Sequence, residues 1–140
     1  MARDIDITIA PMHELPVGYK ARLRELSLGG YEPWGFWSWT FHDGSTWAAI
    51  AFEDRKRTAE NIIGWAAVTE QIDMLPVVGC YVEKDRRGSG VAEDLIVLLL
   101  RNLIRRKVLE SGGSVYASTW RWPKYTEIIE SAGLHCLDWV

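Results

Sequence analysis

The chain has 140 residues, of which 48% are hydrophobic and 25% charged, and its formal net charge is −3. This composition excludes a disordered chain, and the acidic balance disfavours a general nucleic-acid binder while mildly favouring a basic or amine-bearing substrate. At this length we expect one domain over residues 1–140. Its two cysteines lack metal-ligand spacing, so we expect free thiols in a reducing, cytoplasmic compartment. No apolar run suits a signal peptide or a membrane span, so neither is expected.

The first half of the chain predicts strands around one helix. Ile5, Ile7 and Ile9 alternate with polar residues, which indicates a strand with one buried face. Apolar side chains at helical spacing, led by Leu23 and Leu26, then predict a helix from Pro16 to Leu28. The following segments are predicted as a strand or ordered loop at Phe36–His42, a strand at Thr46–Glu53, a charged connector at Asp54–Glu60, and an antiparallel pair of strands at Asn61–Glu70 and Leu75–Glu83.

The second half predicts a long helix, a strand, a short helix and a final strand. The long helix is expected over Val91–Glu110, with its stop at Gly112-Gly113 and an apolar face of Leu95, Leu98, Leu99 and Leu103. Basic residues in its last turns suit a helix C-terminus, so a solvated face is favoured over a nucleic-acid patch. The remaining elements are a strand at Val115–Ala117, a helix opened by Pro123 with Tyr125, Ile128, Ile129 and Ala132 on one face, and a strand at Leu134–Val140.

The segment Tyr81–Ala92 carries the strongest functional signal, because it passes from an apolar strand through two glycines into the long helix. A helix N-terminus offers unsatisfied backbone N–H groups and a positive dipole end, so an anionic ligand is expected there. The P-loop pattern is rejected because no lysine follows Gly90, and the dinucleotide-binding pattern because Glu93 occupies its third small position. The plain alternative is a strand-to-helix turn beside solvated arginines.

The spacing Arg87-x-x-Gly90-x-Ala92 resembles the acetyl-CoA pyrophosphate loop of the GNAT N-acetyltransferase superfamily, R/Q-x-x-G-x-G/A, and the order of predicted elements resembles that of the family over nearly the whole chain. The resemblance implies an α/β fold with a mixed, mostly antiparallel central sheet flanked by helices, in which the fourth and fifth strands splay apart. It implies acetyl-CoA as cosubstrate. The residues that would bind it are Cys80, Tyr81 and Val82 for the pantetheine arm, and Arg87, Gly88, Ser89, Gly90, Val91 and Ala92 for the pyrophosphate.

The resemblance also implies acetyl transfer to a primary amine, either of a small molecule or of a protein lysine or N-terminus. The sequence departs from the family at the usual catalytic tyrosine, which is Ile129 here, and at the usual glutamate, which would fall near Pro76. Tyr125 lies one turn before Ile129 on the same helix face and is the candidate general acid, with core packing as the alternative. Candidate bases are Glu83, Glu70 and His42, each of which is otherwise a surface residue. No histidine shows ligand spacing, so no metal is expected.

An aromatic segment at residues 31–39 holds five aromatic side chains in nine residues. It falls in the region that forms the acceptor side of the cleft in GNAT proteins, which makes Trp34, Phe36 and Trp37 candidate substrate-binding residues, since aromatic faces attract alkylammonium groups. Core packing and a protein-docking surface are the alternatives. The rival function for the whole chain is a weakly catalytic or non-catalytic acyl-CoA-binding module that acts through protein contacts.

Overall fold

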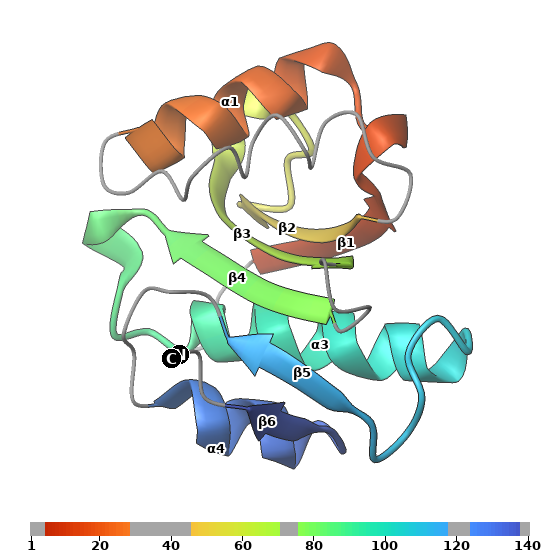
Figure 1. Cartoon of the computed structure of the whole chain (residues 1–140). Coiled ribbons are helices and arrows are strands. Elements are labelled where there is room, and N and C mark those ends of the chain that lie inside the picture. Colours follow the sequence, from red (N-terminus) through yellow and green to blue (C-terminus); the bar gives the residue numbers. More distant parts are fainter. Residues whose placement is uncertain (1–4, 29–45, 71–75, 118–123, 138–140) are drawn as a thin grey trace.

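A computed structural model describes residues 5–28, 46–70, 76–117 and 124–137 of the chain (Figure 1). Its strands and helices follow one another as β1 (Ile5–Pro11), α1 (Val17–Leu28), β2 (Trp47–Glu53), β3 (Ile62–Glu70), β4 (Pro76–Val82), α3 (Val91–Arg105), β5 (Ser114–Ala117), α4 (Lys124–Ser131) and β6 (His135–Leu137). Short 3₁₀ turns precede α1, β3 and the loop to α3, at η1 (Met12–Glu14), η2 (Ala59–Asn61) and η3 (Lys84–Arg86). None of the helices in these ranges is long and apolar enough to cross a membrane.

The strands form one mixed sheet in the order β1-β2-β3-β4-β5-β6. The pairs from β1 to β4 are antiparallel, whereas β4–β5 and β5–β6 are parallel. Within the described residues β5 pairs with β4 only at Val77 and Val78, although β4 continues to Val82. The chain after Ala117 lies outside the described residues, so the mixed, mostly antiparallel sheet is confirmed, whereas the splay of the fourth and fifth strands stays a prediction.

Two apolar clusters cover the two faces of the sheet, and Figure 1 shows α1 on one side and α3 with α4 on the other. Alternation along the strands separates them: Ala49, Ala51 and Ala66 face α3, whereas Ile50 and Phe52 face α1. The small alanines let α3 approach the sheet closely, and its leucines fill the remaining space. Ile5, Ile7 and Ile9 of β1 pack against the α3-facing cluster, as their alternation predicted.

Helix α3 ends at Arg105 instead of Glu110, so the expected stop at Gly112-Gly113 is wrong. Lys107 adopts a left-handed conformation (φ 61°), its N–H bonds to the carbonyl of Ile104 at 3.0 Å, and the Val108 N–H bonds to that of Leu103 at 2.9 Å. This pattern is a Schellman cap, usually built on glycine at the left-handed position. Sequence reasoning therefore placed the stop at the first glycines, several residues too late.

The expected apolar face of α3 is wrong at Leu98, which is 46% exposed. The buried side chains of the helix are Val91, Leu95, Ile96, Leu99, Leu100 and Leu103. Elsewhere the predicted elements are confirmed with shifts of a few residues at their ends. The segment Phe36–His42 lies outside the described residues, and the assignment of the chain to one domain stays a prediction.

Leu95 and Leu98 provide a matched pair of core and surface leucines on one helix. Leu95→Ala removes a fully buried side chain and is expected to lower the free energy of unfolding by about 2–5 kcal/mol. Leu98→Ala should lower it by less than about 1 kcal/mol, because that side chain already contacts solvent. Urea denaturation followed by tryptophan fluorescence measures both values. Equal costs would contradict the burial described for α3.

Candidate functional site

The connection from β4 to α3 is a loop shaped by two glycines in the left-handed region. Gly88 has φ 80° and Gly90 has φ 86°, and a Cβ built on either would meet no atom within 4 Å. Gly90 is the N-cap of α3 and provides no side-chain hydrogen bond to the helix. The first backbone N–H groups of α3 therefore have no capping side chain at Gly90, and a helix N-terminus of this kind can bind anions.

Arg87 is held beside this loop by neutral groups. Its Nε donates to the Val82 carbonyl at 2.9 Å, and its guanidinium carbon lies 5.2 Å from the centre of the Tyr81 ring. A carbonyl and an aromatic face orient the cation without cancelling its charge. Arg87 therefore retains a full positive charge at the end of β4, next to the uncapped helix N-terminus.

The second half of β4 has backbone groups directed to the β5 side, beyond the last described pair with β5. The Glu83 N–H bonds to the Ile63 carbonyl at 2.8 Å, so alternation turns the backbone groups of Tyr81 toward β3 and those of Cys80 and Val82 toward the β5 side. The Val82 carbonyl on that side already accepts from Arg87. The Val82 N–H and both backbone groups of Cys80 therefore point to the β5 side, beyond the last described pair at Val78 and Ala117.

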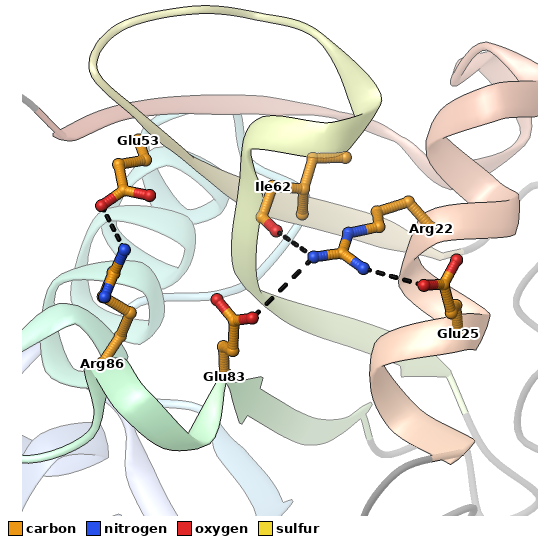
Figure 2. Close-up of polar contacts among 6 residues, drawn as sticks. All are labelled: Arg22, Glu25, Glu53, Ile62, Glu83 and Arg86. Carbon is orange, nitrogen blue, oxygen red and sulfur yellow. Dashed lines mark hydrogen bonds and ion pairs between the residues drawn. The ribbon is translucent and has the colours of Figure 1, made fainter.

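Two arginines hold the turn that leads out of β4, and Figure 2 shows them approaching the start of β3 from opposite sides. Arg22 of α1 lies 4.0 Å from the Glu83 carboxylate and 3.0 Å from that of Glu25. Arg86 of η3 donates to the carboxylate of Glu53, the last residue of β2. Sequence reasoning identified neither pair, because each joins residues that are distant along the chain.

No protein-family model matches the sequence, and no curated protein matches it by sequence. Solved structures do resemble the fold. A ribosomal-protein-alanine N-acetyltransferase from Brucella melitensis biovar Abortus 2308 has a TM-score of 0.54 and 16% identity over 97% of this chain and 94% of its own. Spermidine N-acetyltransferase from Vibrio cholerae has a TM-score of 0.61 and 16% identity over 93% and 78%. A tandem GNAT protein from the clavulanic acid biosynthesis pathway has a TM-score of 0.53 and 15% identity over 76% and 35%.

The chain has the GNAT fold. The expectation drawn from Arg87-x-x-Gly90-x-Ala92 and from the order of elements is thereby confirmed for the architecture. At these identities the likeness concerns the fold, so the residues that bind ligand and the reaction itself remain to be argued from the site.

The catalytic candidates occupy different surroundings within the GNAT fold. Tyr125 is 3% exposed and belongs to the α3-facing core, which is the position that core packing requires. Glu83 extends toward α1 and pairs with Arg22. Glu70 is the last residue of β3, and the placement of its side chain lies outside what the structure describes. His42 and the aromatic candidates lie outside the described residues, namely Trp34, Phe36 and Trp37. The roles of all these residues stay predictions.

Acidic side chains in the first turn of α3 are directed to its two flanks. Glu93 reaches α4, where its carboxylate lies 3.6 Å from Lys124 Nζ. Asp94 lines a pocket of about 440 Å³ on the flank toward β1, together with Ile5, Ile7, Ser89, Val91 and Leu98. Glu93, which would repel a bound anion, is thus partly compensated by a neighbouring cation.

Cys80 is a partly buried residue of β4 that packs against the α3-facing core. Burial raises the pKa of this thiol from its ordinary 9.0 to about 12. Only a thiolate is an effective nucleophile, so Cys80 stays neutral and unreactive near pH 7. The GNAT fold of this chain therefore offers no activated cysteine at this position, and transfer through an acyl-cysteine at residue 80 is disfavoured.

The raised pKa of Cys80 can be measured by alkylation in a Cys136→Ser background, where Cys80 is the sole cysteine. At pH 8 a shift from 9.0 to about 12 lowers the thiolate fraction about a thousandfold. We expect iodoacetamide to label the folded protein at least ~100-fold more slowly than the urea-unfolded protein. Similar rates in the two states would show that the thiol is accessible and its pKa ordinary.

Proposed function

We propose that the protein is an acetyl-CoA-dependent N-acetyltransferase that modifies a primary amine. The observation that carries the proposal is the loop between β4 and α3, where two left-handed glycines precede an uncapped helix N-terminus beside Arg87. This loop directly follows β4, and the expected gap between β4 and β5 would let one ligand contact both the loop and the backbone of β4. The names of two similar structures, a spermidine and a ribosomal-protein-alanine N-acetyltransferase, support a small-molecule amine or a protein amine as acceptor.

The loop fits the diphosphate of a CoA molecule. Backbone N–H groups from Gly88 to Ala92 would bind the phosphate oxygens, and Arg87 would add charge-assisted hydrogen bonds. Open space at the Cβ positions of both glycines leaves room for the phosphates. The backbone of Cys80 and the Val82 N–H would hold the amides of the pantetheine arm along the gap.

Bound acetyl-CoA supplies an acetyl thioester, which reacts with a neutral amine to give an amide and the free CoA thiol. The protein has to orient the amine, accept the proton that its nitrogen loses, and deliver a proton to the sulfur. We assign the first proton transfer to a carboxylate or imidazole at the cleft, with Glu83, Glu70 and His42 as candidates. We assign the second to the Tyr125 hydroxyl or to solvent, because a thiolate leaves readily without help.

A second function is supported by one observation. Ile129 occupies the usual position of the catalytic tyrosine and is fully buried, and Tyr125 is 3% exposed in the same core. A helix α4 devoted to packing fits an acyl-CoA-binding module without efficient catalysis, acting through protein contacts. The two functions share the loop and differ in whether an amine releases CoA.

The ligand assignment predicts that CoA and acetyl-CoA raise the melting temperature. At a hundred times Kd either ligand should stabilise the protein by about 2.7 kcal/mol, whereas ATP and NAD should do so far less. Gly90→Glu should abolish the shift, because the new carboxylate would project into the space proposed for the phosphates. Differential scanning fluorimetry measures these shifts.

Gly112→Glu is the matched control for Gly90→Glu. Gly112 also has a left-handed φ (78°) with open space at its Cβ, but it follows the C-terminal end of the 15-residue helix α3, which is roughly 22 Å long. Both variants should lose similar stability without ligand, about 1–2 kcal/mol, and only Gly90→Glu should lose the response to CoA. Equal stabilisation of the wild type by ATP, or none by millimolar CoA, would overturn the assignment.

The role of Tyr125 is tested by removing its hydroxyl group. If this hydroxyl protonates the leaving sulfur, Tyr125→Phe should lower kcat by about 10²–10⁴ while CoA affinity changes little. Tyr19→Phe is the control, because Tyr19 donates its hydroxyl to the Arg57 carbonyl at 2.5 Å, away from the loop. Steady-state CoA release with an amine panel gives kcat. An unchanged kcat in Tyr125→Phe across the pH range would assign that side chain to packing.

A further inference from the structure

The ion pair between Glu53 and Arg86 connects the end of strand β2 to the start of the loop that follows β4. Glu53 ends β2, Arg86 lies in η3, and β3 separates β2 from β4 in the sheet. The two side chains are 36% and 35% exposed, so the pair is half-buried and shielded from full solvent screening. Figure 2 shows the guanidinium of Arg86 directed at the Glu53 carboxylate.

The backbone of Arg86 forms hydrogen bonds with the loop, so the ion pair that holds Arg86 also restrains the loop. Its carbonyl accepts a hydrogen bond from the Ser89 hydroxyl, and its N–H donates to the Glu83 carbonyl at 2.9 Å. Ser89 lies between the two left-handed glycines. Glycine has the greatest backbone freedom of any residue, so a loop with glycines at 88 and 90 keeps one conformation only if its other residues are held. The contacts of Arg86 provide such a hold.

We propose that Glu53 is a positioning residue for the anion-binding loop: by holding Arg86, it fixes the backbone of residues 87–90 in the conformation that receives the diphosphate. Glu53 acts through Arg86 and does not itself contact the ligand. This inference rests on the proposed function for its ligand. Preorganisation of a binding loop improves affinity because less conformational entropy is lost when the ligand binds.

The positive charge of Arg86 supports a competing expectation, in which removal of Glu53 increases the affinity for the anion instead of lowering it. If Glu53 merely neutralised Arg86, its removal would free a second cation beside Arg87 and strengthen anion binding. If Glu53 positions the loop, its removal weakens binding despite the added positive charge. The sign of the change in CoA affinity therefore distinguishes positioning from neutralisation.

The experiment compares the wild type with Glu53→Gln, Arg86→Gln and the double variant. We expect each single variant to raise the Kd for CoA and the KM for acetyl-CoA about 5- to 20-fold while kcat stays within about twofold. The double variant should resemble the singles, because both remove the same interaction. Arg86→Lys should restore part of the affinity, since it keeps the charge.

Asp6→Asn is the matched control. It breaks an equally direct carboxylate–arginine pair, between Asp6 of β1 and Arg57 at 2.5 Å, in which neither residue belongs to the loop. Its Kd for CoA should stay within about twofold of the wild type. A similar loss of affinity in Asp6→Asn would show that any strand-end ion pair has this effect, and would overturn the assignment.

Amide hydrogen exchange without CoA provides a readout that is independent of ligand and reaction. Peptides covering residues 86–92 should exchange at least ~5-fold faster in Glu53→Gln than in the wild type. In Asp6→Asn their exchange rate should equal that of the wild type. Tighter CoA binding in Glu53→Gln, or unaltered affinity and exchange, overturns the positioning role. A wild type that does not bind CoA overturns the proposed function, and the exchange rates then still decide whether Glu53 holds the loop.

Discussion

The direct passage of β4 through η3 and the glycine loop into α3 is the constraint on which the candidate site depends. Strand β4 pairs with β3 along its whole length, and in the described range it pairs with β5 at Val77 and Val78. Under the proposed function, the backbone groups of Cys80 and Val82 on the β5 side bind the pantetheine arm. Because β4 runs directly into η3 and the glycine loop, the N-terminus of α3 follows soon after the end of β4. A long ligand with amides and phosphates matches this succession of features.

The packing of α3 fixes where that helix N-terminus lies. Alanines on one face of β2 and β3 admit the helix close to the sheet, and leucines from several of its turns fill the space between them. Burial of this stripe stabilises the helix far more than its caps do, so the first turn can remain without a capping side chain at Gly90. Core packing thereby compensates for the stability lost at an uncapped N-terminus, and the N–H groups there remain available to an anion.

The sequence was sufficient for features that depend on neighbours along the chain. The alternation at Ile5, Ile7 and Ile9 and the strand-glycine-helix order around Gly90 are local patterns, and both led to the observed architecture. Features that depend on spatial arrangement were missed. The Glu53–Arg86 pair joins positions 33 residues apart, and the stop of α3 relies on Lys107 in a conformation that usually indicates glycine. The exposure of Leu98 follows from how α3 is rotated on the sheet, which periodicity alone leaves open within one residue.

The charges around the loop explain why an acidic chain can still present a site for anions. Three carboxylates described near the turn and the first turn of α3 each have a cationic neighbour: Glu53 with Arg86, Glu83 with Arg22, and Glu93 with Lys124. Arg87, in contrast, is oriented by the Val82 carbonyl and the Tyr81 ring, which carry no net charge. Its positive charge therefore adds to the dipole of α3 instead of being cancelled within the protein. The overall charge of −3 does not describe the field at this loop, because three nearby carboxylates have cationic neighbours while Arg87 lies beside the N-terminus of α3.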